Sequence, residues 1–418
     1  MKRNFYVYNE GILLKIAFFS FGLIPLTSER IEVLVSILFC VMVLVSSLLN
    51  IKSNNPRKPN SLFVINSLLF FVLLMTFFDG IDLLASKKLE QMVSLYIFPL
   101  IFFLVSIHDK NKVLVLFELW KKVFFISTVL FCLISFYLIS QYSNPRYPNF
   151  DSNFFQNAIL DAPYFARDPG YISIFINISI LIGFSWVLSA RKRIILIVWS
   201  LFVLLLLLFM LSVKISIISL ITSTLIYLFF ILSKKKFIIW FSSILLGIVI
   251  FSVVTPNKYN RFSKFFDTNV LYDNSQYNSI FVHKLTILCA VNIFGENLFT
   301  GIGVENAKKE VNSCVRQYYT YLPMDIYNSH NQYLGYALYS GILGLSVLFI
   351  ALFLALYKSY KEDKFLFVIM VLYCIIFLTE NVLERQSGLI LFCFLLNMIP
   401  VIEDYSQTFK KINQKTNT

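Results

Sequence analysis

The sequence predicts an all-α protein that forms one integral membrane domain over residues 1–418. Hydrophobic residues make up 58% of the chain and charged residues only 14%, and the mean hydropathy is +0.74. Soluble domains are far less apolar than this. The apolar residues also form runs long enough to cross about 30 Å of hydrocarbon, which takes about 20 helical residues. Because such runs recur along most of the chain, they favour a polytopic helical bundle over several soluble domains.

Twelve runs have about the length of a transmembrane helix. In chain order they are 10–27, 31–51, 61–79, 91–107, 121–141, 170–190, 194–212, 214–233, 237–255, 332–357, 364–380 and 386–402. The eighth run follows the seventh directly, and Lys214 is the only charged residue between 194 and 233. We therefore expect a tight turn at Lys214, with a lysine that snorkels to the interface as the structural alternative.

Basic residues lie mainly in the short breaks between runs, as at 191–193 and 234–236. Cytoplasmic loops are enriched in Lys and Arg, so this pattern puts both termini in the cytoplasm. The segment 141–169, the Lys214 turn and a large loop over 256–331 then lie outside. The net charge of +13 has the same explanation, and we expect membrane lipids as neighbours and no nucleic-acid partner.

Within the large loop, apolar residues recur at helical spacing from Phe281 to Phe294, which predicts an amphipathic helix lying on the membrane surface. A turn with Gly301 and Gly303 follows. Cys289 and Cys314 also fall in this loop, and two cysteines alone leave open whether they pair.

His330 lies where this polar loop meets the apolar run 332–357. An imidazole has an ordinary pKa of about 6.5 and can take a proton near neutral pH. The cations expected on the same face are Arg167, Lys214, Arg261, His283, Lys284 and Arg385. Several cations together suit a diphosphate, and one neutral imidazole can accept the proton of an attacking hydroxyl. No Asp-x-Asp or His/Cys cluster with metal-ligand spacing stands out, so we expect no metal or cofactor.

Three of these residues also have a structural explanation. His330 can cap a helix or form hydrogen bonds at the interface. Arg167 stands beside Asp168, and Arg385 stands beside Glu384, so each arginine can form a local ion pair instead.

The order of these motifs resembles the bacterial O-antigen ligase and polymerase family. His330-Asn331, nine residues and then Gly341-x-x-Gly344 is similar to that family's H-N-x9-G-x-x-G signature. Upstream, the stretch from His283 to Gly303 is similar to that family's loop pattern, in which a basic residue precedes a helix that ends in E-N-x-x-x-G-x-G. The Ser212-x-Lys214 turn resembles the family's Ser-Ser-Arg/Lys turn. The resemblance covers roughly residues 165–390.

The resemblance implies a GT-C-like, polytopic, metal-independent glycosyltransferase of the bacterial inner membrane. Such an enzyme moves a glycan from undecaprenyl diphosphate to an acceptor on the periplasmic side, in lipopolysaccharide or polysaccharide synthesis. We expect an O-antigen ligase whose acceptor is lipid A–core, and the alternative is a polymerase that joins lipid-linked repeat units. His330 would be the general base, and the residues that bind diphosphate or glycan would be Lys214, Arg261, His283, Lys284, Arg167, Arg385 and Asn331.

Two positions depart from the family. His283 stands where the family usually has Arg, and Lys214 replaces the commoner Arg. Lysine keeps the charge but loses the bidentate fork of a guanidinium.

A transporter of a lipid-linked or anionic substrate is the competing class. Transporters place ionisable residues near the bilayer midplane, whereas the charges of this sequence gather mainly between the runs, at the membrane edges. This distribution favours chemistry at the outer surface.

Overall fold

The structure is a computed structural model and describes residues 2–50, 60–77, 83–142, 152–162, 166–189, 194–254, 279–318 and 328–416. These residues form helices and contain no strand, which confirms the predicted all-α class. The elements are α1 (Lys2–Gly22), η1 (Ile24–Leu26), α2 (Glu29–Asn50), α3 (Ser61–Leu74), η3 (Met75–Phe77), α4 (Leu83–Met92), α5 (Ser94–Val105), α6 (Lys110–Gln141), α7 (Ser152–Leu160), α8 (Pro169–Leu188), α9 (Ile194–Leu211), α10 (Lys214–Ile231), α11 (Lys234–Val254), α13 (Ser279–Glu296), α14 (Gly303–Tyr318), α15 (Gln332–Glu362), α16 (Lys364–Ile376), η5 (Val382–Glu384) and α17 (Gln386–Thr416).

Every apolar run predicted as a span overlaps one or two of these helical elements. Within the described residues, 8 helical stretches are long and apolar enough to cross a membrane, and they involve α2, α5, α6, α8, α9, α10, α15 and α17. Parts of α1, α3 and α16 are shorter apolar helices of 10–17 residues. A multi-pass membrane protein follows from these lengths, while the number of twelve crossings stays a prediction.

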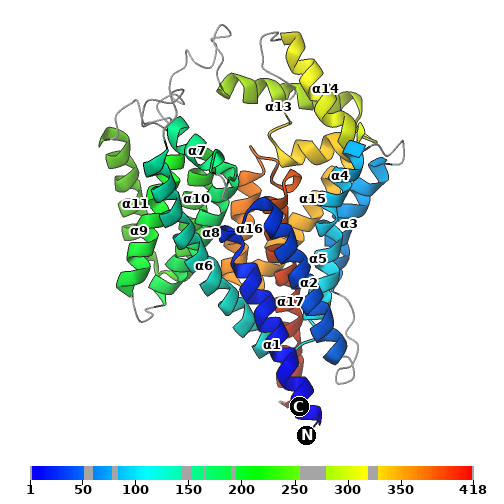
Figure 1. The fold of residues 1–418 in the computed structure, drawn as a ribbon, viewed down its shortest axis with the longest axis vertical. Helices are drawn as coiled ribbons and strands as arrows, with labels where there is room; N and C mark the ends of the chain where they lie inside the picture. Colours follow the sequence, from blue (N-terminus) through cyan, green and yellow to red (C-terminus); the bar gives the residue numbers. More distant parts are fainter. Residues whose placement is uncertain are drawn as a thin grey trace.

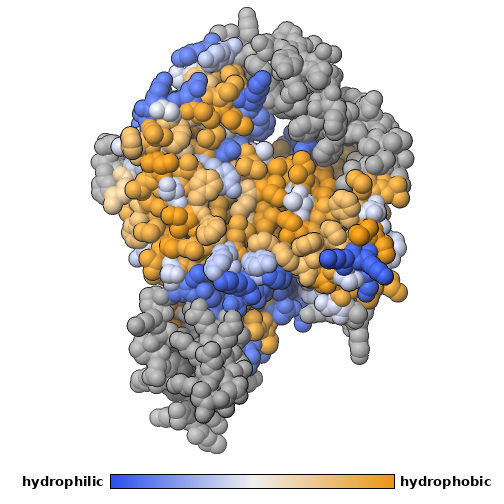
Figure 2. Space-filling view, turned by 180° about the vertical axis from the view of Figure 1, so that it is seen from behind, coloured by the Kyte–Doolittle hydropathy of each residue, from blue (hydrophilic) through white to orange (hydrophobic). Residues whose placement is uncertain are grey.

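The two chain ends lie together at one end of the bundle, and α7, α13 and α14 lie at the opposite end (Figure 1). Apolar side chains form a band across the middle of the molecule, with hydrophilic ones gathered above and below it (Figure 2). Such a band between two polar rims is the surface expected of a protein embedded in lipid.

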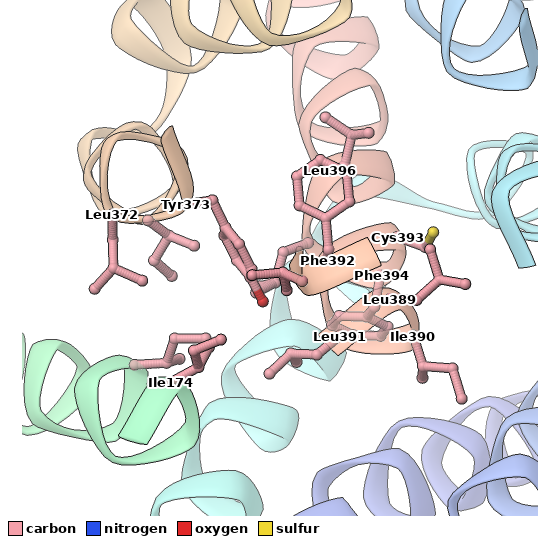
Figure 3. Packing of buried hydrophobic residues seen from close by; sticks show 14 of the residues in the cluster. Ile174, Leu372, Tyr373, Leu389, Ile390, Leu391, Phe392, Cys393, Phe394 and Leu396 are labelled. Atoms are coloured by element: carbon pink, nitrogen blue, oxygen red, sulfur yellow. The ribbon is translucent and has the colours of Figure 1, made fainter. Parts of the chain in front are cut away.

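The centre of the bundle is α17. In its membrane-length window 94% of the residues are buried, against 28% in the peripheral α9. Buried rings interlock around it: Phe394 stacks on Phe21 at 4.3 Å between ring centroids, and Phe392 meets Tyr373 edge-on at 5.1 Å. Figure 3 shows Tyr373, Phe392 and their aliphatic neighbours. Since lipid is as apolar as these side chains, close van der Waals packing rather than the hydrophobic effect holds such helices together.

The large loop contains two packed helices outside the apolar bundle. The predicted helix over 281–294 is confirmed as α13, while its place on the membrane surface stays a prediction, and α14 was not predicted. Val304, Ala307, Val311 and Val315 recur every three or four residues along α14 and are buried on one face. A disulfide between Cys289 and Cys314 joins the two helices, which answers the question that the sequence left open.

Candidate active site

The predicted turn between α9 and α10 is confirmed at Ser212 and Val213. Ser212 has a left-handed backbone (φ 51°), and α10 begins at Lys214. The N-cap residue Val213 makes no side-chain hydrogen bond to the helix. The first backbone N–H groups of α10, which begins at Lys214, are therefore not capped by that residue. Helix N-termini attract anions, and the half-buried Lys214 adds a full positive charge there.

The two glycine motifs of the sequence are two halves of one backbone contact. Gly301 (φ 68°) and Gly341 (φ 64°) both have left-handed backbones, and Gly341 interrupts α15. A Cβ on Gly341 would lie 2.3 Å from the carbonyl oxygen of Phe299, and one on Gly301 would lie 2.6 Å from the nitrogen of Gly341. Only glycine fits both positions.

Two backbone hydrogen bonds fix this contact. The N–H of Ile302 donates to the carbonyl oxygen of Leu338 at 2.7 Å, and the N–H of Ile342 donates to that of Leu298 at 2.8 Å. The turn after α13 is thereby held against α15, the helix that begins two residues after His330. The glycine motifs thus fix how α13 sits relative to the histidine loop.

His330 sits in a strained loop that polar side chains hold in place. Its φ is 45°, which is uncommon for a residue other than glycine. Its backbone N–H donates to Asn328 Oδ1 at 3.0 Å, and Asn328 Nδ2 donates to Glu384 Oε2 at 3.2 Å. Asn381 Nδ2 donates to the hydroxyl of Ser329 at 3.1 Å. Strained backbone held by its surroundings is common at functional sites.

Glu384 is the anchor of this loop. Besides Asn328, it accepts hydrogen bonds at Oε1 from Asn381 Nδ2 at 2.6 Å and from the hydroxyl of Tyr339. Sequence reasoning missed both Asn328 and Glu384 as site residues. The signal for Asn328 was its place two residues before His330, where an Asn side chain commonly binds the backbone. Glu384 lies 56 residues away from Asn328, and no local pattern joins them.

The imidazoles of His330 and His283 are in contact. Their ring centroids are 4.2 Å apart and the ring planes are inclined by 56°. Burial and, next, His283 lower the pKa of His330 to about 4, while Glu384 raises it. The pKa of His283 is lowered by burial and then by Lys214. Both rings are therefore neutral at pH 7, and at this distance a proton on one ring disfavours a proton on the other.

The structure does not bring Arg167 to this cluster. Its side chain is buried and pairs with Glu32 Oε1 of α2 at 2.5 Å. The hydroxyl of Ser387 donates to the other oxygen of Glu32 at 2.5 Å. The predicted alternative was an ion pair between Arg167 and Asp168. It is wrong, because Arg167 pairs with Glu32, a carboxylate 135 positions away. Glu32 of α2 is thus joined both to Arg167, just before α8, and to Ser387 of α17.

The remaining predicted residues have separate positions. Arg385 is exposed and faces Asp168 at 3.4 Å, not Glu384. Asn331 caps α15 by accepting from the N–H of Leu334 at 3.0 Å, and its role in substrate binding stays a prediction. Lys284 follows His283 on α13 and is exposed. Arg261 lies outside the described residues.

Two recesses border η5, one with Val382 in its lining and the other with Glu384. The first lies between α8, the start of α10 and η5, and its lining is mainly apolar: Gly170, Tyr171, Ile174, Val213, Ile215, Ser216, Ile376, Glu380 and Val382. Burial and, next, Asp168 raise the pKa of Glu380 to about 7, while Arg385 lowers it.

The second recess is polar and lies between α4, α14, α15 and η5. Its lining is Lys88, Ala307, Lys308, Asn328, Ser329, Gly335, Leu338, Tyr339 and Glu384. In the part of the chain that the structure describes, no group of three His, Cys, Asp or Glu is arranged as metal ligands are.

A comparison with known families supports the same region of the chain. Residues 199–349 match the family model described as O-antigen ligase. A search of curated proteins gives no match for this chain. The matched stretch contains Lys214, His283, both glycine motifs and His330, the residues that the fold brings to one end of the bundle. It supports the resemblance seen in the sequence: residues 199–349 of this chain match the model of the O-antigen ligase family.

Proposed function

We propose that this protein is an O-antigen ligase that works at the periplasmic face of a bacterial inner membrane. It transfers a glycan from undecaprenyl diphosphate to lipid A–core. One observation carries the proposal. A neutral, half-buried His330 is held in a strained loop against His283 and near Lys214, inside the stretch that matches the ligase family. Three further features support it.

The first feature is the apolar recess beside Lys214. A lipid-linked donor has an anionic diphosphate joined to a hydrocarbon chain. Lys214 and the open start of α10 suit the diphosphate, and the neighbouring recess, with Ile174, Val213 and Val382 in its lining, suits the first units of the polyprenyl chain. The exposed Arg385, which lies 5.8 Å from the ring centroid of Tyr171 in this lining, is a second cation for the donor.

The second feature is the state of His330. A general base must be unprotonated before it acts, and the lowered pKa of His330 keeps it neutral. In the proposed step the acceptor hydroxyl oxygen bonds to the anomeric carbon of the donor sugar, and His330 takes the hydroxyl proton. The bond between that carbon and the diphosphate oxygen breaks, and its electron pair leaves with the diphosphate. Lys214 stabilises the charge on the leaving group.

The third feature is the disulfide between α13 and α14. Disulfides form in oxidising compartments such as the bacterial periplasm. Because α13 carries His283, the disulfide supports a periplasmic position for the whole site. Both chain ends, at the opposite end of the bundle (Figure 1), would then be cytoplasmic, in agreement with the distribution of Lys and Arg.

The test compares His330→Ala and Lys214→Ala with the parent protein in glycan transfer from a lipid-linked donor. We expect His330→Ala to abolish transfer with unchanged protein yield, and Lys214→Ala to weaken donor use more than acceptor use. Full transfer by His330→Ala would refute the role of His330 as the general base. In a deletion strain, free full-length polymer identifies a ligase, whereas lipid A–core bearing a single repeat identifies the alternative, a polymerase.

A further inference from the structure

The polar recess lies on the side of η5 that the proposed donor does not use. Val382, on one side of η5, lines the apolar recess, and Glu384, on the other, lines the polar one. The polar recess also includes Asn328 and Ser329, the two residues directly before His330. A molecule in this recess therefore lies next to the proposed base and away from the apolar recess beside Lys214.

The lining of this recess has the groups that bind sugars. Asn328 and Glu384 are half-buried and have amide and carboxylate groups, which bind sugar hydroxyls, whereas Ser329 and Tyr339 are buried. Asn328, Asn381 and the hydroxyl of Tyr339 already donate to the carboxylate of Glu384, so its charge is partly compensated. The recess is thus polar without being strongly negative.

Two lysines from different helices also line this recess. Lys88 of α4 places its Nζ 5.5 Å from the centroid of the Tyr339 ring and 3.5 Å from the carbonyl oxygen of Val304, a long contact. Lys308 of α14 is exposed. Among the ion pairs of the described residues neither lysine takes part, whereas the next residue, Lys309, pairs with Glu305 at 2.6 Å. With Glu384, the two lysines leave the recess with one net positive charge.

We propose that the polar recess is the acceptor subsite, and that Lys88 and Lys308 select an acceptor sugar with an anionic substituent near its attacking hydroxyl. This rests on the proposed glycan transfer. In an inverting displacement the attacking oxygen approaches the anomeric carbon opposite the leaving group. With the diphosphate at Lys214, the acceptor is placed in the polar recess, whose lining includes Asn328 and Ser329, the residues directly before His330. The substituent is a phosphate or a carboxylate, since both have the charge and the oxygens that lysine binds.

The experiment measures the acceptor KM of the purified protein in lipid nanodiscs with two matched pairs of acceptors. One pair is a phosphate-bearing oligosaccharide before and after phosphatase, and the other is a uronic acid-bearing one before and after carboxyl reduction. For the parent protein we expect removal of the charge to raise the acceptor KM about tenfold in one pair, as for loss of a charge-assisted contact. The pair that responds identifies the anion.

The variants test whether the two lysines cause this preference. In the double variant Lys88→Gln, Lys308→Gln we expect the tenfold ratio to fall to about one, because no cation remains to recognise the anion. Lys88→Arg with Lys308→Arg should keep most of the ratio, since the charges stay. Lys309→Gln is the matched control on α14 and should keep it entirely. A ratio that survives in the double Gln variant overturns the proposal, as does a parent protein with no preference in either pair.

A binding arm separates this proposal from the proposed function. The same four acceptors are titrated into protein with His330→Ala, alone and combined with the double Gln variant, and the Kd is measured without turnover. One outcome is that no transfer occurs in any assay, yet the charged acceptor binds about tenfold more tightly than its neutral partner, and only when the lysines are present. The proposed reaction would then be wrong, and the acceptor subsite would still be supported. Equal Kd values with and without the lysines refute the subsite.

Discussion

The contact between His283 and His330 gives the sharpest prediction, because it makes the pH dependence of the reaction a property of both rings. A proton on His283 would lie about 4 Å from the base. Two unit charges at that distance interact by about 4 kcal/mol at an effective dielectric constant of 20. The full interaction would lower the pKa of His330 by about three units. Both rings are half-buried, so solvent screens part of the interaction, and we expect the pKa of His330 to fall by roughly one to two units.

His283→Arg and His283→Gln perturb the contact in opposite directions. Arginine places a permanent positive charge beside His330 and should lower its pKa below about 4. Glutamine removes the ring whose charge lowers that pKa and should raise it. Because His330 acts as a base only when neutral, the acid limb of the profile of kcat against pH should move to lower pH with arginine and to higher pH with glutamine.

The two variants should also differ at neutral pH. A base whose pKa falls by one to two units loses about three- to tenfold in kcat if half of the change appears in the rate. We therefore expect a lower kcat and a lower donor KM with arginine, since the guanidinium binds the diphosphate well. With glutamine we expect a higher donor KM. The assay is steady-state transfer from pH 4 to 8 with both substrates varied in turn. The same acid limb in all three proteins would refute the coupling between the rings.

Three other predictions follow from the packing of the site. Glu384→Gln removes the anchor of the His330 loop and the charge that raises the pKa of His330, so kcat should fall about tenfold and the acid limb should shift to lower pH; an unchanged profile would leave Glu384 no electrostatic role. Gly341→Ala should destabilise the fold by about 2–4 kcal/mol, because its Cβ would meet the Phe299 carbonyl oxygen at 2.3 Å. Gly295→Ala is the matched control, with nothing within 4 Å of the new Cβ, and an equal shift of Tm in both would contradict the strain argument. Arg167→Gln leaves the carboxylate of Glu32 buried without its cation and should lower the free energy of unfolding by about 3–5 kcal/mol. Thermal unfolding in nanodiscs measures this change. A loss of activity without a change in Tm would contradict the structural role and favour binding of the donor by Arg167.

The sequence by itself determined the helical class, the approximate places of the apolar helices and the two residues, His330 and Lys214, around which the proposed site is built. Hydrocarbon thickness fixes the length of an apolar run, so each run could be predicted without knowing its neighbours. The Lys214 turn could be predicted for the same reason, since a run of twice the needed length has to fold back near its middle. His330 was visible because it is a titratable group where a polar loop meets an apolar helix.

Only the tertiary structure decided which residues meet. Apolar periodicity reports how one helix faces its surroundings, and it carries no information on which helix packs against it. The contact of His283 with His330, the Glu384 anchor and the joining of the two glycine turns all depend on such packing. Arg167 shows the same limit: its neighbour in sequence, Asp168, caps α8 and faces Arg385, while its ion pair lies with Glu32 on α2. A charged side chain buried in a helical bundle must have a partner, and the fold, not the local sequence, supplies it.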